Sequence, residues 1–99
     1  MEPAKIQVTL TCNNGNTDVG QSVYAVGSTT ELGNWTPANA LALSADNYPT
    51  WSGTVEIPAG TTVEWKCIKK AGEAVVWSEQ ANSSFTTPDS GTTSSTGSF

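Results

Sequence analysis

The segment VYAVGSTTELGNW, residues 23–35, combines a short strand, its end, and a turn that delivers a tryptophan. Its first four residues are β-branched or aromatic apart from one alanine, a composition typical of strands. Gly27 ends that strand, and Gly33-Asn34 makes a turn directly before Trp35. Polar residues and a proline surround Trp35, so its indole has few apolar neighbours in sequence. The indole therefore either covers a core or forms a flat platform that faces outward.

The rest of the chain repeats this pattern of short strands and turns. Ile6, Val8 and Leu10 alternate with polar residues, and residues 51–57 alternate in the same way. Strands are predicted over residues 5–12, 21–26, 39–43, 51–57, 62–68, 74–77 and 84–87, with a single helical turn at 29–32 and a loop at 46–49. Seven to eight short strands predict an all-β fold, a two-sheet antiparallel β-sandwich with an immunoglobulin-like Greek key.

The 99 residues are enough for one domain with a single core. We expect residues 1–88 to form the sandwich. Residues 89–99, rich in Ser, Thr and Gly, are expected to form a disordered tail because they are too polar to pack. No signal peptide is visible, and residues 1–4 are expected to be an expression start. No segment is long and apolar enough to span a membrane.

The amino-acid composition argues against several classes of partner and cofactor. Lys and Arg number 4 against 9 Asp and Glu, so nucleic acids and anionic membranes are not expected as partners. The chain has no His, which removes the usual general base and the commonest metal ligand. No cofactor or metal is expected. Sparse charge with abundant Thr, Ser, Asn and Gly suits an extracellular surface that meets neutral polar ligands.

The two cysteines, Cys12 and Cys67, both lie in predicted strands with apolar neighbours. Their spacing fits no zinc pattern. They form one disulfide if their strands are adjacent and the compartment is oxidising. The alternative is a pair of buried thiols that act as small hydrophobic side chains.

Four tryptophans in this chain call for an explanation. Trp65 shares a strand face with Val63 and Cys67, so we assign it to the core. Trp51 opens a strand beside a polar loop, where core packing and ligand contact remain equal alternatives. Trp35 and Trp77 adjoin polar loops and are candidates for ligand platforms. A flat indole can cover the apolar face of a sugar ring while polar groups bind its hydroxyls, at about 1–3 kcal/mol per contact by analogy with base stacking.

Residues 6–87 resemble the starch-binding domains of carbohydrate-binding module family 20, found on amylases and glucoamylases. Four motifs together carry the resemblance: GQSVYAVGSTTELGNW (20–35), LALSADNYPTW (41–51), IPAGTTVEWKCIKK (57–70) and VVWSEQANSSF (75–85). The resemblance implies a non-catalytic module that binds α-1,4-glucan.

The resemblance implies a first carbohydrate-binding site, which we call site 1. Its platforms fall on Trp35 and Trp77, and its hydrogen-bonding groups on Lys66 and Asn82. The position after the second tryptophan is often Glu in the family, and here it is Ser78. The alternative for Lys66 is a solvated charge on a strand.

The resemblance also implies a weaker site, which we call site 2. Asp46, Tyr48 and Trp51 match the family's loop and tryptophan. The aromatic position before the second strand is Val19, although Gly20 and Gln21 remain. We expect one good site and one poor site.

The expected function is to anchor a secreted amylolytic enzyme to granular starch. The expected ligands are starch, maltooligosaccharides and cyclodextrin-like α-glucans. The expected partner is a covalently linked catalytic domain, and the module is expected to be a monomer. An enzyme would need an acid and base pair, and the available carboxylates have no obvious partners: Glu31, Asp46, Glu64, Glu73 and Glu79. The alternative function is an extracellular adhesion or structural sandwich without glycan specificity.

Overall fold

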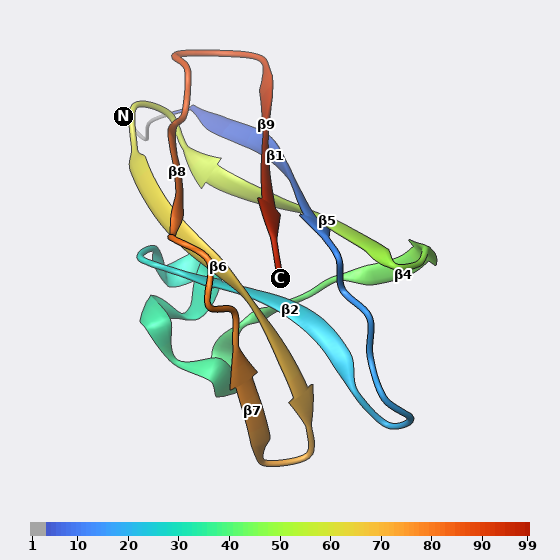
Figure 1. The fold of residues 1–99 in the computed structure, drawn as a ribbon. Coiled ribbons are helices and arrows are strands. Elements are labelled where there is room, and N and C mark those ends of the chain that lie inside the picture. The colour runs from blue at the N-terminus through green and yellow to red at the C-terminus, as the bar shows by residue number, and fades with distance from the viewer. Residues whose placement is uncertain (1–3) are drawn as a thin grey trace.

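Two β-sheets pack against each other in the computed structural model, which describes residues 4–99 (Figure 1). Residues 1–4 were expected to be an expression start, and the first three of them lie outside the described residues. Within residues 4–99 the strands are β1 (Lys5–Asn13), β2 (Ser22–Gly27), β3 (Leu41–Ala42), β4 (Ser44–Asn47), β5 (Thr50–Pro58), β6 (Thr62–Ala71), β7 (Ala74–Trp77), β8 (Ser83–Thr86) and β9 (Thr92–Ser98). Two 3-10 helices, η1 (Thr30–Trp35) and η2 (Pro37–Asn39), follow β2. Neither helix has the length or the apolar character needed to cross a membrane.

The first sheet has the strand order β4-β5-β1-β9, and the second has the order β3-β2-β6-β7, with β8 also paired to β6. The predicted two-sheet sandwich is therefore confirmed. Two details differ from the prediction. The pair β1–β9 is parallel, whereas the prediction was antiparallel throughout. Residues 46–49, predicted as a loop, supply part of the short strand β4.

The core lies between the sheets and follows from the alternation of apolar residues. Successive side chains of a strand point to opposite faces, so every second residue of β1 turns inward. Val63, Trp65 and Cys67 do the same in β6, and Trp65 is fully buried. The assignment of Trp65 to the core is confirmed.

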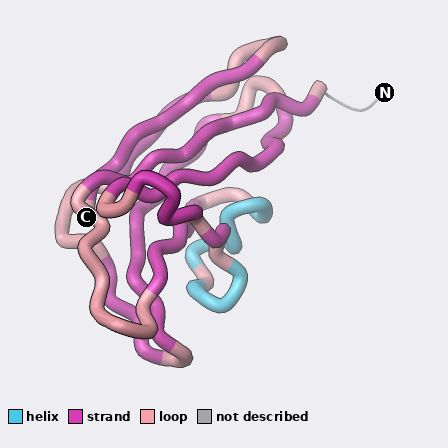
Figure 2. Tube along the Cα trace, turned by 90° about the vertical axis from the view of Figure 1, so that its right-hand side faces the viewer, coloured by secondary structure: helices cyan, strands magenta, loops and turns pink. Residues whose placement is uncertain are grey.

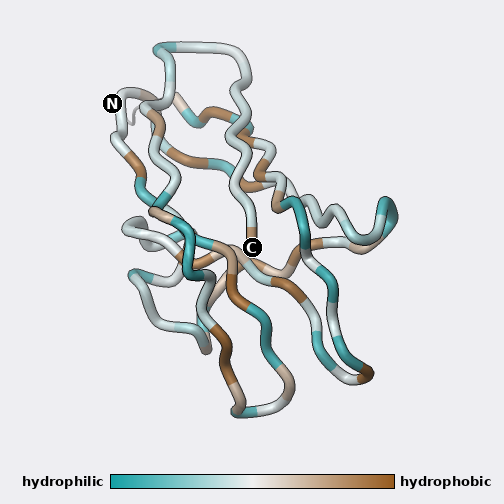
Figure 3. The backbone as a smooth tube through the Cα atoms, viewed as in Figure 1, coloured by the Kyte–Doolittle hydropathy of each residue, from teal (hydrophilic) through white to brown (hydrophobic). Residues whose placement is uncertain are grey.

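The prediction of a disordered tail over residues 89–99 is wrong, because Thr92–Ser98 forms β9 along the edge of β1. Figure 3 shows β9 in pale colours of intermediate hydropathy, so it has no apolar stripe. Its less exposed side meets Trp65 instead: the indole Nε1 donates to Ser95 Oγ at 2.9 Å. Gly97 lies so close that a Cβ there would come within 3.2 Å of the same ring. The polar strand β9 packs here because it covers the buried indole of Trp65 and accepts the hydrogen bond of its N–H group.

The outer face of the second sheet also carries fully buried residues. Val26 and Ile68 alternate with the inward residues Ala25 and Cys67, so they point away from the main core, yet both are fully buried. The η1–η2 segment packs against β2, and Lys70 Nζ donates to the Pro37 carbonyl at 2.7 Å. Figure 2 shows the helical turns grouped together on one side of the strands. The segment that follows β2 therefore packs on β2 and accepts a hydrogen bond from Lys70 of β6.

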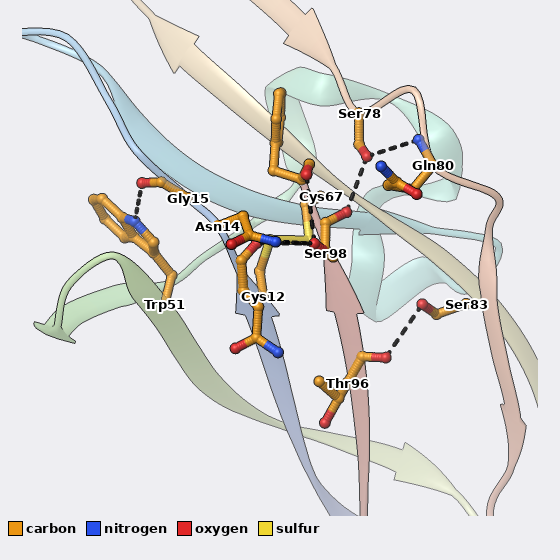
Figure 4. Close-up of a disulfide and its surroundings, with 12 residues drawn as sticks. Cys12, Asn14, Gly15, Trp51, Cys67, Ser78, Gln80, Ser83, Thr96 and Ser98 are labelled. Carbon is orange, nitrogen blue, oxygen red and sulfur yellow. Dashed lines mark hydrogen bonds between the residues drawn. A yellow bond between two sulfur atoms is a disulfide. The ribbon is translucent and has the colours of Figure 1, made fainter.

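Cys12 of β1 and Cys67 of β6 form a disulfide that joins the two sheets, which decides between the two alternatives left open by the sequence (Figure 4). Their Cα atoms are 6.3 Å apart, within the usual range for a disulfide. The bond connects residues 55 apart in sequence. It ties β6, which carries Lys66, to the opposite sheet.

Candidate functional site

The turn that carries Trp35 is built around Gly33. Gly33 has φ +84°, and a Cβ at this position would lie 2.7 Å from the carbonyl oxygen of Asn39. Glycine is therefore required both by the backbone conformation and by the close approach of the chain. The Gly33 carbonyl in turn accepts a hydrogen bond from the Thr36 amide at 2.9 Å, which closes the turn around Trp35.

Asn34 and Trp35 are themselves left-handed, with φ of +51° and +64°. Asparagine adopts this conformation readily, but for a bulky residue such as tryptophan it is unusual. Such a residue costs on the order of 1–3 kcal/mol and persists only where the surroundings impose it, often at a binding site. The turn therefore presents a half-buried indole in a defined orientation.

Lys66 and Trp77 share the outer face of the second sheet. Trp77 of β7 pairs with Ile68 of β6, and residues directly opposite in an antiparallel pair point to the same side. Lys66 lies two residues before Ile68 and so points to that side as well. Trp35 belongs to η1, which packs against β2, the neighbour of β6 in the same sheet. Trp77 remains 41% exposed, too much for a core residue. The fold thus brings Lys66 and Trp77 to one face of the sheet.

The ammonium group of Lys66 is not a free surface charge. Its Nζ donates to the carbonyl of Ser78 at 3.1 Å and to that of Gln80 at 2.6 Å. An ammonium group has three N–H donors, so one remains for a ligand. The two bonds hold the loop between β7 and β8, which leads to the exposed side chain of Asn82. Lys66 therefore positions this loop in addition to facing the site.

Ser78 does not contribute its hydroxyl to the exposed surface, which corrects its assignment to site 1. The residue is only 4% exposed. Its Oγ donates to the Ser98 carbonyl at 3.0 Å and accepts from the Gln80 amide at 3.1 Å (Figure 4). Because the Ser78 hydroxyl makes both of its hydrogen bonds inside the protein, it stabilises the loop between β7 and β8.

The loops proposed for site 2 meet across a gap of about thirty residues in sequence. The Gly15 amide donates to the Pro49 carbonyl at 2.8 Å, and the Thr17 amide donates to the Tyr48 hydroxyl at 3.1 Å. Tyr48 is 49% exposed, so its ring is open to solvent while its hydroxyl is held. These contacts hold the ring at the surface. Local sequence could not reveal Gly15 or Thr17 as partners, because each acts through a backbone group.

Trp51 belongs to the core, which decides between the two alternatives left open for it. It is 6% exposed, and its Nε1 donates to the Gly15 carbonyl at 2.7 Å (Figure 4). Its ring meets the ring of Tyr48 edge-on, with centroids 6.2 Å apart and an interplanar angle of 71°. Trp51 therefore supports the Tyr48 ring from below and has little surface to offer a ligand.

The remaining site 2 residues lie on the surface of the same loops. Val19 is fully exposed, and Gly20 beside it has φ +90° with open space around its Cα. Gln21 Oε1 accepts from the Asp18 amide at 2.9 Å, so this side chain stabilises its own turn. Asp46 is exposed in β4. Tyr48 is thus the aromatic group that this region presents, with no second ring at Val19.

The chemistry available at both sites is that of binding. Each offers exposed aromatic surface next to hydrogen-bonding groups, the combination that fits the apolar faces and hydroxyl rim of a sugar ring. Within residues 4–99, no group of three or more His, Cys, Asp or Glu side chains is arranged to hold a metal ion.

Comparison with known proteins identifies relatives over nearly the whole chain. The family model described as starch binding domain matches residues 5–97, a range that includes most of β9. A glucan 1,4-alpha-maltotetraohydrolase from Stutzerimonas stutzeri is 44% identical over 95 residues, covering 91% of this chain and 17% of that protein. A cyclomaltodextrin glucanotransferase from Bacillus sp. (strain 38-2) is 45% identical over 92 residues, covering 89% of this chain and 13% of that protein.

A solved structure matches over its full length. The crystal structure of the family 20 carbohydrate-binding module of the maltotetraose-forming amylase from Pseudomonas saccharophila STB07 aligns with a TM-score of 0.86 and 39% identity, covering 95% of this chain and 100% of that chain. In contrast, this chain spans less than a fifth of the length of the two enzymes above. The shared region is therefore one module of those enzymes, and the chain belongs to the starch-binding domains of carbohydrate-binding module family 20, which are non-catalytic.

Proposed function

We propose that this module binds the α-1,4-glucan chains of starch at site 1, with Trp35 and Trp77 as stacking platforms. Lys66 and Asn82 supply hydrogen bonds to the sugar hydroxyls. The observation that carries the proposal is the 41% exposure of Trp77 on the sheet face that also carries Lys66. An exposed indole leaves apolar surface in contact with water, which is unfavourable unless a ligand covers it. The flat apolar face of a sugar ring matches an indole in shape and polarity.

Site 2 is proposed as a weaker contact that rests on the Tyr48 ring. A single platform with no aromatic partner at Val19 offers less stacking than the pair at site 1. Two unequal sites on different loops would allow the module to hold two glucan segments at once. The combined avidity then depends on the spacing of the chains on the granule.

In its parent protein, we propose that the module anchors a secreted amylolytic enzyme to granular starch. The relatives named above are enzymes that act on glucans, and this chain matches a small part of each. Linking a binding module to a catalytic domain raises the local substrate concentration for that domain. Maltooligosaccharides and cyclodextrins are proposed as soluble ligands, and the module is proposed to act as a monomer.

The test is sedimentation with raw starch granules, with cellulose as the control polymer. The double variant Trp35→Ala with Trp77→Ala should fold and stay in the supernatant. Losing about 2 kcal/mol of stacking per ring weakens binding about thirtyfold per residue. Trp65→Ala is the matched core control, expected to lose about 3–5 kcal/mol of stability. A folded double variant that still sediments with granules would refute the platform assignment.

A further inference from the structure

Two asparagines of this chain lie in the acceptor pattern for N-linked glycosylation, which is Asn-x-Ser/Thr with any residue except proline in the middle. The sequence contains seven asparagines, and only Asn34 and Asn82 have Ser or Thr two positions later. The first pattern spans residues 34–36 and the second spans residues 82–84. Both asparagines are exposed. Each pattern includes a residue assigned to site 1, so the positions that can be modified coincide with the proposed glucan site.

Asn82 lies next to Lys66 at the end of a strand ladder. The antiparallel register of β6 and β8 ends with Trp65 opposite Ser83, and the next residues of the two segments are Lys66 and Asn82. Because Ser83 begins β8, Asn82 is the last residue of the loop between β7 and β8. Lys66 Nζ donates hydrogen bonds to two carbonyls of this loop. A group attached to the Asn82 side chain therefore lies beside Lys66, within site 1.

The side chain of Asn82 is open to modification, and its hydrogen bonding would change with it. The residue is exposed. The amide group of an unmodified asparagine offers two N–H donors and one carbonyl acceptor. N-glycosylation leaves one N–H and adds a bulky, hydrophilic oligosaccharide. A group proposed to bind sugar hydroxyls thus loses a donor and gains a substituent in the space that a glucan chain needs.

The disulfide between Cys12 and Cys67 is typical of proteins that fold in an oxidising compartment, such as the lumen of the endoplasmic reticulum. N-glycosylation takes place in that same compartment, where an oligosaccharide is transferred from a lipid diphosphate to asparagine. The side-chain amide nitrogen forms a bond to C1 of the first sugar, and the bond between C1 and the diphosphate oxygen breaks. The nitrogen loses one proton, and the lipid diphosphate leaves.

We propose that Asn82 accepts an N-linked glycan when the chain is secreted through an endoplasmic reticulum, and that this glycan blocks site 1. The blocking effect rests on the proposed function of site 1. We assign it to Asn82 because this residue is itself a member of the site, whereas Asn34 precedes the platform Trp35 without belonging to it. Starch binding then depends on whether the cell that produces the module glycosylates it.

The experiment compares protein secreted from yeast with protein secreted into the periplasm of a bacterium that lacks the transferase. The background is Thr36→Ala with Tyr48→Ala, which removes the acceptor pattern of Asn34 and the platform of site 2. Both substituted residues are exposed. Asn82 is then the one acceptor left in the chain, and site 1 is the one site with its aromatic platforms.

Two serine variants are compared in this background. Ser84→Ala destroys the acceptor pattern, keeps Asn82 and changes an exposed residue. Ser83→Ala is the matched control, because it makes the same chemical change one position earlier and keeps the acceptor pattern. Mass spectrometry of peptides locates the glycan, and thermal melting establishes that each protein is folded. Sedimentation with raw starch granules measures binding.

From yeast, the background and Ser83→Ala should carry a glycan on Asn82 and bind granules at least about tenfold more weakly than their bacterial counterparts, a factor equal to about 1.4 kcal/mol. Ser84→Ala from yeast should be unmodified and should sediment with granules. From the bacterium, all three proteins should sediment to the same extent.

An unmodified Asn82 in the protein from yeast would refute the acceptor assignment. A folded, glycosylated protein that sediments as well as its bacterial counterpart would refute the blocking effect, as would weak sedimentation of unmodified Ser84→Ala from yeast. Failure of the bacterial background protein to sediment would instead refute the proposed function of site 1, and the blocking effect with it. Mass and sedimentation together distinguish these outcomes.

Discussion

Replacing Ser95 with Ala tests whether the last strand is part of the folded domain. Ser95 Oγ accepts the hydrogen bond of the Trp65 indole at 2.9 Å, and Trp65 is fully buried. The substitution removes the acceptor and leaves a buried N–H without a partner. Such an unsatisfied group costs about 1–3 kcal/mol, and Ser95 is itself half-buried, so we expect the lower part of this range.

A loss of about 1–2 kcal/mol lowers the melting temperature of a domain of this size by about 4–16 °C. The loss is smaller than the total stability of about 5–15 kcal/mol, so the variant should remain folded at room temperature. Thermal denaturation followed by circular dichroism measures the shift. Starch sedimentation at room temperature should be unchanged, because Ser95 contacts neither site.

The matched control is Ser94→Ala, which makes the same chemical change one position earlier on the exposed side of β9. It should shift the melting temperature by little, since exposed substitutions usually stay within about 0.5 kcal/mol. If Ser95→Ala and Ser94→Ala melt together with the parent protein, β9 does not pack on Trp65 and the reasoning is wrong.

Two further predictions concern site 2 and the disulfide. Val19→Tyr should strengthen binding of cyclic and long maltooligosaccharides without loss of stability, because Val19 is fully exposed; calorimetry that finds two equal sites in the unmodified protein would contradict it. Reduction of the Cys12–Cys67 bond, which connects residues 55 apart, should lower stability by about 2–4 kcal/mol. Denaturant titration with and without reductant measures this loss, and coincident curves would count against it.

Much of the fold could be predicted because its signals are local. Alternation of apolar and polar residues located β1, β5 and β6, and it placed Trp65 in the core. The Gly33-Asn34 pair identified the turn before Trp35, since the left-handed backbone there demands these residue types. Each of these inferences depends on neighbours within a few positions in the chain.

The candidate sites were only partly predictable. The resemblance to the family supplied Trp35, Lys66 and Trp77, and the strand register brings Lys66 and Trp77 to one face. It could not indicate that Ser78 is buried, because its partners Ser98 and Gln80 come from β9 and from the loop itself. Ser98 lies 20 residues away in sequence, and a partner that distant leaves no local pattern.

Local sequence patterns were enough to predict the all-β class, the positions of most strands and the tight turn before Trp35. Which polar segments fold, and which tryptophans are buried, depends on contacts between segments far apart in the chain. β9 has no apolar stripe, and it is a strand because β1 supplies its backbone partners and Trp65 its buried surface. Trp51 and Trp77 both adjoin polar loops in sequence, yet one is 6% and the other 41% exposed. Burial depends on what a distant segment places over a side chain, and local periodicity carries no information about that segment.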